Sequence, residues 1–183
     1  MPRAGPEKLE LQSKIHIRQA TVADAAQLAD LGRRAFVDAF GSQNDPAHIQ
    51  EYVAVAFAVD RMEDEIKDPL AEFLIAEAAG EALGYAKITL GKAPACVTSP
   101  DPIELERIYV HQSAIGTGVG SALMSACLEA IATRGGRSAW LGVWERNERA
   151  IRFYRKWGFE IVGAKVFLLG GDMQTDVVMV RQV

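Results

Sequence analysis

Three glycines spaced two residues apart, Gly116, Gly118 and Gly120, are the residues of this chain best suited to bind a ligand through the backbone. They follow the apolar run 108–110 and precede a segment of helical periodicity. Glycine allows close approach of a ligand and tolerates positive φ. A helix that begins after such a turn presents unpaired N–H groups and the positive end of its dipole. The segment therefore predicts a phosphate site.

Two familiar phosphate-binding loops do not fit this segment. The loop of nucleotide hydrolases requires a lysine before its Ser or Thr, and no lysine precedes Ser121. The dinucleotide loop requires two residues before its last glycine and a position beside the first strand of the fold. Here a single residue, Val119, fills that gap, and the loop lies deep in the chain. A flexible turn before an ordinary helix remains the alternative for the loop alone.

A second candidate segment follows a short apolar run at 139–144, which reads as a buried strand. Asn147 suits the N-cap of a helix, and Gly158 suits its C-terminal end. Residues at i, i+3, i+4 and i+7 place four side chains on one face of that helix, namely Ala150, Phe153, Tyr154 and Trp157. Taken alone, this pattern predicts packing rather than chemistry for Tyr154.

The two segments occur together in one enzyme superfamily. Gly-x-Gly-x-Gly after a strand resembles the acetyl-CoA loop of the GNAT superfamily of N-acetyltransferases. The pattern Asn-x-x-Ala-x-x-Phe-Tyr-x-x-x-Gly-Phe at 147–159 resembles the second signature of that superfamily. The resemblance covers roughly residues 15–183, which we expect to form a single domain. It implies an α/β fold with a central mixed, mostly antiparallel sheet and helices on both faces.

The resemblance also implies a cosubstrate, acetyl-CoA, and direct transfer of its acetyl group to an amine in a ternary complex without a metal. The backbone of the strand before the loop would pair with the pantetheine arm. Tyr154 would donate a proton to the coenzyme sulfur, because a phenol with a reference pKa of about 10 is protonated at neutral pH. The residues implied in coenzyme binding are Ile108, Tyr109, Val110, Gly116, Thr117, Gly118, Val119, Gly120, Ser121, Asn147, Ala150 and Tyr154.

Two glutamates are candidates for the base that takes the proton of the amine. Glu104 and Glu106 share one face of a predicted strand, because strand side chains alternate with period two. Either could act directly or through water, and a solvent-facing charge is the alternative for both. Glu104 is preferred, because some relatives carry a glutamate base at a matching strand position. The three histidines have no metal-ligand spacing.

One loop residue departs from the superfamily pattern. Ile115 stands where Arg or Gln usually helps to hold the pyrophosphate. Backbone donors remain, and Arg149 or Lys156 could supply the missing charge. The departure keeps open a reading of another class, a non-catalytic acyl-CoA-binding module.

A narrower likeness concerns the acceptor. Segments 36–41, 103–110, 140–145 and 167–176 look like the bacterial spermidine/spermine acetyltransferase (PaiA-like) branch. This likeness implies a small-molecule primary amine, with polyamines first. A protein N-terminus or lysine, or an antibiotic-type amine, is the alternative.

Carboxylates of the variable region 36–66 could form an acidic groove for such an amine. Asp38 and Glu51 are preferred for this role, because they lie on helices otherwise rich in apolar residues. The triplet at 63–65, Glu-Asp-Glu, is expected on the solvated face of a short helix.

Composition limits the possible partners. Net charge is −4, which argues against a nucleic-acid partner that needs a positive field. No stretch approaches the ~20 apolar residues that span a bilayer, and two cysteines are too few for a disulfide framework. Residues 1–14 read as a mobile tail without a secretory core, so we expect a cytoplasmic protein. A homodimer is left open.

Periodicity and turn residues predict the order of elements. Strands are expected at 15–18, 73–77, 83–90, 103–110 and 138–144, with two more around the turn 170–172. Helices are expected from Thr21 to about Phe40, after Asp45-Pro46, from Asp60 to near Asp68, at about 117–133 and at 147–157. Strands paired first by hairpins and then linked by helices favour a mixed sheet covered on both faces.

Overall fold

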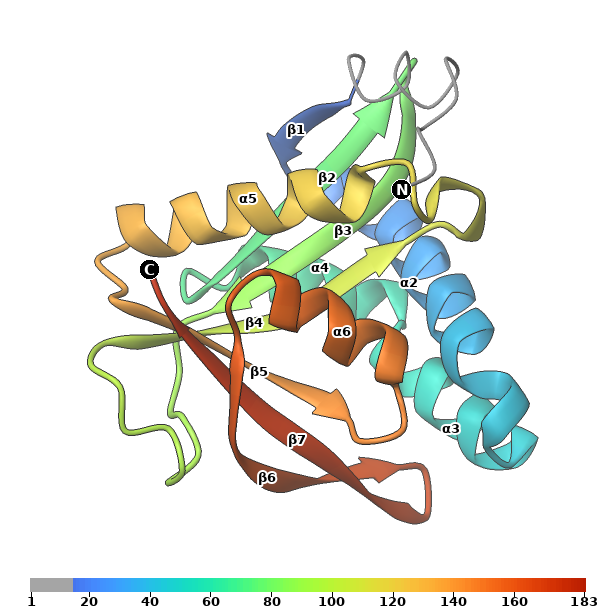
Figure 1. Ribbon diagram of the computed structural model, residues 1–183. Helices are drawn as coiled ribbons and strands as arrows, with labels where there is room; N and C mark the ends of the chain where they lie inside the picture. The colour runs from blue at the N-terminus through green and yellow to red at the C-terminus, as the bar shows by residue number, and fades with distance from the viewer. Residues whose placement is uncertain (1–14) are drawn as a thin grey trace.

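Seven strands form one sheet in the computed structural model, which describes residues 15–183 (Figure 1). Their order across the sheet is β1-β2-β3-β4-β5-β7-β6. Neighbouring strands are antiparallel except for β4 and β5, which are parallel. The strands are β1 (His16–Gln19), β2 (Ala71–Ala78), β3 (Glu81–Thr89), β4 (Pro102–Val110), β5 (Ser138–Trp144), β6 (Glu160–Leu169) and β7 (Asp172–Gln182). The predicted α/β architecture is confirmed, while the predicted tail at 1–14 lies outside the described residues.

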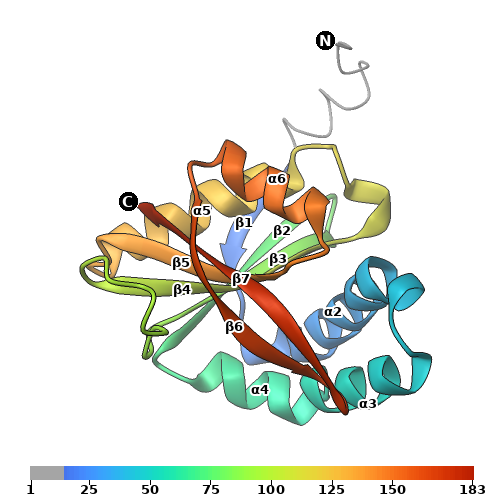
Figure 2. The same cartoon turned by 60° about the horizontal axis from the view of Figure 1, so that its bottom comes forward.

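Helices cover both faces of this sheet. Figure 2 shows α5 (Val119–Thr133) and α6 (Glu148–Lys156) on one face. The opposite face carries α2 (Ala25–Phe40), α3 (Pro46–Ala56) and α4 (Val59–Lys67). Single 3₁₀ turns lie at Val22–Asp24, Gly41–Gln43 and Gln112–Ala114. Among residues 15–183, no helix is both long and apolar enough to cross a bilayer.

Two predicted helix starts are confirmed by their hydrogen bonds. The Asp24 carboxylate accepts from the backbone N–H of Thr21 at 2.7 Å, as the predicted capping box requires. The Asp45 carboxylate accepts from the N–H of Ala47 at 2.7 Å, with Pro46 in the first position of α3.

Two other starts differ from the prediction. Helix α4 begins at Val59 with Ala58 as its N-cap, so that Asp60 lies in the first turn, where its charge meets the positive end of the helix dipole. Helix α5 begins at Val119, because Gly118 adopts the left-handed conformation, with φ at 103°, and ends the preceding loop.

Each face of the sheet has its own apolar core. Leu123, Met124 and Ile131 of α5 are fully buried against the sheet. On the opposite face, Leu28 and Phe36 of α2 pack with residues of α3, α4 and the sheet. The two cores leave the middle of the sheet, between β4 and β5, as the place where a cavity forms. Both cysteines are free thiols, as predicted.

Candidate active site

The parallel strands β4 and β5 pair over only three residues and then separate. Residues 102–104 pair with residues 138–140. Beyond that point β4 stays paired with β3 as far as Val110, and β5 stays paired with β7 as far as Trp144. The edges that β4 and β5 turn toward each other are therefore unpaired beyond Glu104. An unpaired strand edge can bind an extended ligand through its backbone.

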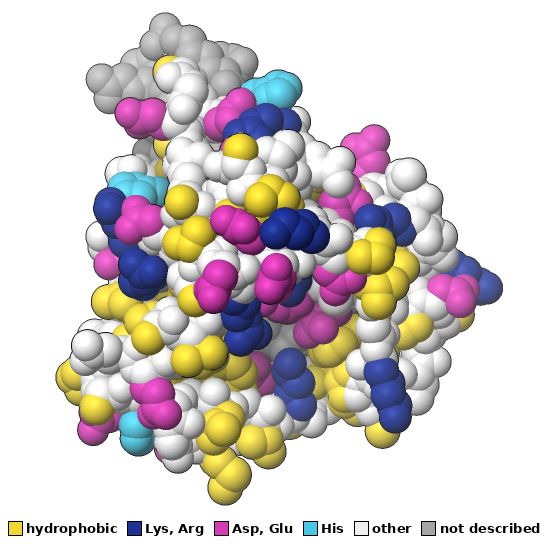
Figure 3. All heavy atoms as spheres, turned by 180° about the vertical axis from the view of Figure 1, so that it is seen from behind, with side chains coloured by type: hydrophobic (Ala, Val, Ile, Leu, Met, Phe, Trp, Pro, Cys, Tyr) yellow, Lys and Arg dark blue, Asp and Glu magenta, His cyan; other side chains and the backbone are white. Residues whose placement is uncertain are grey.

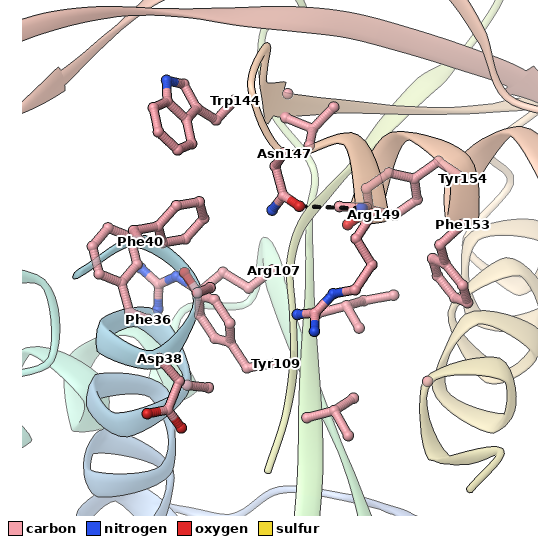
Figure 4. A pocket seen from close by; sticks show the side chains of 18 of the residues that line it. Phe36, Asp38, Phe40, Arg107, Tyr109, Trp144, Asn147, Arg149, Phe153 and Tyr154 are labelled. Atoms are coloured by element: carbon pink, nitrogen blue, oxygen red, sulfur yellow. Dashed lines mark hydrogen bonds between the residues drawn. The ribbon is translucent and has the colours of Figure 1, made fainter. Parts of the chain in front are cut away.

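A cavity of about 690 Å³ fills this gap, which is within the size range of ligand sites. One end is lined by the glycine loop and by residues of α5 and α6. The other end is lined by residues of α2, β6 and β7, on the opposite side of the sheet. Figure 4 shows Phe36, Asp38 and Phe40 across this cavity from Phe153 and Tyr154. The predicted coenzyme end and the predicted acceptor end therefore share one cavity.

The glycine loop presents the N-terminus of α5 to the cavity. Gly116 and Gly118 have φ values of 78° and 103°, which glycine adopts without steric strain. The first helical hydrogen bond runs from the N–H of Ala122 to the carbonyl of Gly118, at 2.9 Å. The N–H groups of residues 119–121 therefore have no partner within the helix. Gly116, Gly118, Gly120 and Ser121 all line the cavity.

Thr117 and Val119, which the resemblance also implied, place their side chains outside the cavity. The Thr117 hydroxyl donates to the carbonyl of Ala114 at 2.6 Å, and its N–H donates to the same carbonyl at 3.2 Å. The side chain of Val119 is fully buried in the core under α5. Thr117 therefore stabilises the loop, and Val119 has only its backbone N–H to offer a ligand.

Arg149 and Lys156 are the two side chains expected to replace the positive charge that Ile115 lacks, and one of them lines the cavity. Ile115 is 40% exposed and lines the cavity beside Gly116. Arg149 lines the same cavity, and its side chain extends into it from α6 (Figure 4). Lys156, the other cation considered, is not among the lining residues.

Helix α6 contributes Asn147, Ala150 and Tyr154 to the cavity. The side-chain oxygen of Asn147 accepts from the N–H of Ala150 at 3.1 Å and so caps the helix, which leaves the amide N–H groups of Asn147 for a ligand (Figure 4). Tyr154 packs against Phe159, with ring centroids 5.9 Å apart. Burial raises the pKa of Tyr154, so its phenol is protonated at neutral pH.

A bulge in β4 gathers polar side chains on the acceptor side of the sheet. Leu105 pairs with Ile88 and Arg107 pairs with Lys87, which leaves Glu106 as the extra residue. The bulge shifts the alternation of side chains, so Glu104, Glu106 and Arg107 all line the cavity.

The bulge residue Glu106 is held in a buried network of charges. Its carboxylate pairs with Lys87 at 2.8 Å and accepts from the Thr89 hydroxyl at 2.7 Å. Lys87 and Arg107 also pair with Glu65 of α4, at 3.0 and 2.7 Å. Burial raises the pKa of Glu65, but Arg107, Arg61 and Lys87 together more than offset this, and the pKa falls to about 2. These bonds make Glu106 a poor candidate for a base.

Glu65 corrects one prediction about the acidic triplet at 63–65. Its side chain is only 15% exposed, because α4 turns it toward the sheet. Asp64 behaves as predicted, with a side chain 84% exposed. Seen from the side of α4, Asp and Glu side chains alternate with Lys and Arg over the middle of the surface (Figure 3). On α4, Arg61 pairs with Glu65 and Lys67 pairs with Glu63, so these charges are paired within the helix.

Glu104 is much less engaged than Glu106. Its nearest cation is Lys165 of β6, at 3.9 Å. Burial raises the pKa of Glu104, which brings the carboxyl closer to the proton affinity that a base needs at neutral pH. Glu104 is therefore the less engaged of the two carboxylates, and its role as the base stays a prediction.

The acceptor end contains residues that sequence reasoning missed. The sequence placed this pocket mainly within 36–66, but β6 and β7 also line it, through Lys165, Phe167, Leu169, Gln174 and Asp176. Their spacing of two along each strand could have indicated one shared face. Asp38 lines the cavity as predicted, whereas Glu51 lies outside it, beside the turn at Gly170.

Aromatic rings line the acceptor end of the cavity. Phe36 lies 4.5 Å from Phe40 and 4.7 Å from Tyr52 between ring centroids, and Phe40 lies 5.8 Å from Trp144. Such rings can pack the methylene chain of an amine and attract its charge. Within residues 15–183, no cluster of three or more His, Cys, Asp or Glu side chains could hold a metal ion.

The chain is similar in sequence to known proteins. The sequence model described as the Acetyltransferase (GNAT) family matches residues 28–159. An uncharacterised N-acetyltransferase of Mycobacterium bovis is 35% identical over 161 residues, which cover 88% of this chain and 99% of the relative.

Solved structures share the fold at lower identity. The PaiA N-acetyltransferase of Thermoplasma acidophilum, in complex with coenzyme A, has a TM-score of 0.74 at 19% identity, covering 92% of this chain and 99% of that chain. The yncA protein of Salmonella typhimurium, with acetyl-CoA as its cofactor, has a TM-score of 0.70 at 21% identity, covering 92% and 94%.

Proposed function

The chain belongs to the GNAT family of acetyltransferases, and we propose that it transfers the acetyl group of acetyl-CoA to a primary amine of a small cationic molecule, with polyamines first. One observation carries the proposal. A single cavity joins the N-terminus of α5 and the unpaired edge of β4 to an acceptor end that holds buried carboxylates and aromatic rings.

The residues at one end fit a coenzyme with a pyrophosphate and an amide-containing arm. The free N–H groups of residues 119–121 and the positive end of α5 suit the pyrophosphate. The unpaired edge of β4 at 108–110 suits the peptide-like amides of the pantetheine arm. The solved structures with coenzyme A or acetyl-CoA, which share this fold, support this assignment.

Two side chains of this chain would handle the protons of the transfer. The amine nitrogen forms a bond to the acetyl carbon, the thioester C–S bond breaks, and the amine loses a proton while the sulfur gains one. Glu104 accepts the proton from the amine, directly or through water. Tyr154 donates the proton to the sulfur, and its raised pKa keeps it protonated until the thiolate forms.

The acceptor end supports a cationic amine more than a neutral one. Phe36, Phe40 and Tyr52 provide apolar and aromatic contact for methylene groups. Asp38, Glu104 and Asp176 bring negative charge to the same space. The choice of a polyamine rests on these residues and on the sequence likeness of segments 36–41, 103–110, 140–145 and 167–176 to the PaiA-like branch.

A thiol-release assay with acetyl-CoA tests the proposal. Spermidine, pentylamine, a peptide with a free N-terminus and an aminoglycoside serve as acceptors over a salt series. We expect spermidine to have the highest kcat/KM, with an advantage over pentylamine that shrinks as salt rises, because ionic strength screens charge attraction over ~8 Å at physiological salt. A higher kcat/KM for the peptide or the aminoglycoside would assign the acceptor to that class instead. Coenzyme binding without release of thiol on any amine would favour the non-catalytic module.

A further inference from the structure

A carboxylate on β7 lacks a direct hydrogen-bond or ion-pair partner among the described residues. Asp176 is 8% exposed and lines the acceptor end of the cavity. No hydrogen bond or ion pair of its carboxylate is found among residues 15–183, and its oxygens keep some exposure toward the cavity, unlike the enclosed Tyr85 hydroxyl and Trp140 indole N–H. A carboxylate that loses most of its hydration without a direct partner is costly, so a ligand that supplies the partner is the natural explanation.

The strands hold this carboxylate at the acceptor end, beyond the point where β4 and β5 separate. Asp176 pairs with Trp144 of β5 on one side and with Lys165 of β6 on the other. A Cβ atom added to Gly142 of β5 would lie 3.2 Å from the Asp176 carboxylate and 3.1 Å from the Lys165 ammonium. It would also clash with the Lys165 side chain, so a glycine at 142 keeps this space open.

The charges facing Asp176 leave it unbalanced. Arg61 and Arg107 pair with Glu65, and Glu106 pairs with Lys87, so these groups satisfy one another. Asp38 of α2 and Arg149 of α6 also line the cavity. What remains beside Asp176 is Glu104 with Lys165, whose ammonium lies 3.9 Å from the Glu104 carboxylate. Lys165 therefore lies near two carboxylates and pairs directly with only one of them, Glu104.

We propose that Asp176 binds a charged ammonium group of the acceptor, one that is not acetylated, and so selects diamines and polyamines over monoamines. A second ammonium in this space completes the pairing that Lys165 leaves unfinished. Aromatic rings of the cavity contact the methylene chain that links the two nitrogens. The inference rests on the proposed function and names the residue that binds the second charge of the acceptor.

Burial raises the pKa of Asp176 to about 6, although Lys165 opposes the rise. The carboxylate is therefore ionised at pH 7.5 and becomes neutral below pH 6. Spermidine and pentylamine both keep their reacting amines protonated over this range, so the ratio of their kcat/KM values isolates the carboxylate. That ratio should fall as pH drops through about 6.

The test compares Asp176→Asn with wild type on spermidine and pentylamine. We expect kcat/KM for spermidine to fall about tenfold or more. The kcat/KM for pentylamine should change less than about threefold, because its uncharged alkyl tail needs no carboxylate. In the variant the spermidine-to-pentylamine ratio should no longer depend on pH near 6.

Glu51→Gln is the control, because it removes the same charge outside the cavity. It should change neither the kcat/KM for spermidine nor that for pentylamine. Lys165→Met should act in the opposite direction and raise the ratio, because it removes the resident cation.

Equal losses on both amines, or an unchanged ratio in Asp176→Asn, would overturn the inference while leaving acetyl transfer intact. If wild type acetylates no amine, the proposed function fails, and calorimetry of spermidine on the coenzyme A complex still tests the site. Weaker spermidine binding in Asp176→Asn, with unchanged coenzyme A affinity, supports the inference. Equal spermidine binding rejects it.

Discussion

Glu104 and Trp140 form the last pair of the parallel ladder between β4 and β5. Beyond Glu104 the edge of β4 that faces β5 is unpaired, so this pair marks the inner end of the cavity. The Trp140 ring also lies 5.5 Å below the Lys165 ammonium, which holds that cation near Glu104. One pair of residues thus fixes both the length of the unpaired edge and the position of the candidate base.

Changing Glu104 to Gln should lower kcat for all amines, because it removes the proton acceptor. We expect a loss of ~10²–10⁴-fold, the usual contribution of general base catalysis. Kinetics at saturating acetyl-CoA measures it. Glu106→Gln is the matched comparison, and it should mainly lower the melting temperature, because it breaks the pairs with Lys87 and Arg107. The reverse pattern would make Glu106 the base.

Gly118→Ala should weaken coenzyme A binding by at least about tenfold, because the added Cβ disturbs a backbone held at φ 103° beside the free N–H groups. The variant should also lose about 1–3 kcal/mol of stability, because alanine is strained at this φ value. Gly135→Ala provides the control. Gly135 has φ 81° and no atom within 4 Å of an added Cβ, so it carries similar strain away from the cavity. Equal coenzyme affinity of the two variants by calorimetry would remove the loop from the site.

Tyr154→Phe should leave coenzyme A affinity unchanged and reduce kcat by ~10²–10⁴-fold, because the leaving sulfur loses its proton donor. Steady-state kinetics and calorimetry measure the two quantities separately. Tyr85→Phe is the control, since the Tyr85 hydroxyl is buried and unpartnered among the described residues. It should not change kcat. A normal kcat in Tyr154→Phe would return Tyr154 to a packing role, unless product release limits the wild-type rate.

Arg149→Met should weaken coenzyme A binding at low salt by roughly tenfold, because a charge-assisted contact to phosphate contributes ~1.5–3 kcal/mol. Lys156→Met changes the net charge equally, but Lys156 is not among the cavity residues, so it should have little effect. Ile115→Arg should tighten binding if the pyrophosphate still lacks a side-chain cation. No gain from Ile115→Arg together with a loss from Arg149→Met would show that Arg149 already fills this role.

The sequence predicted the fold well because local signals and the resemblance agreed. Alternation and turn residues located the strands, and Asp45 with Pro46 located the start of α3. The start of α5 was placed too early, because the left-handed conformation of Gly118 depends on the folded loop. Periodicity alone does not report such a conformation.

The coenzyme end was more predictable than the acceptor end. The first is lined by the end of β4 with the glycine loop and by the start of α6, and each of these two segments is continuous in sequence and carries its own motif. The acceptor end combines α2, β4, β6 and β7, so Asp176 meets Glu104 and Lys165 only after the sheet forms. The bulge at Glu106 likewise arises from pairing between strands, and the sequence of β4 alone gives no sign of it.

Asp176→Asn should stabilise the protein at pH 7.5. The folded pKa of Asp176, about 6, exceeds its ordinary value of 3.8, so the folded state disfavours the charged form. Between these values the folded state binds more protons than the unfolded state, and the free energy of unfolding falls as pH rises. The resulting cost is complete above pH 6 and absent below about pH 4. We expect the variant to gain about 1–3 kcal/mol at pH 7.5 and nothing at pH 4.

Thermal unfolding of both proteins from pH 4 to 8 measures this difference. Asp64→Asn, whose side chain is 84% exposed in the parent chain, is the control and should shift stability little at any pH. A gain of the same size at every pH would mean that Asp176 is not a strained charge. Saturating spermidine should shrink the gain at pH 7.5, because a bound ammonium stabilises the wild-type carboxylate and not the amide. Greater stability with poorer use of spermidine is the result expected of a residue retained for binding rather than for folding.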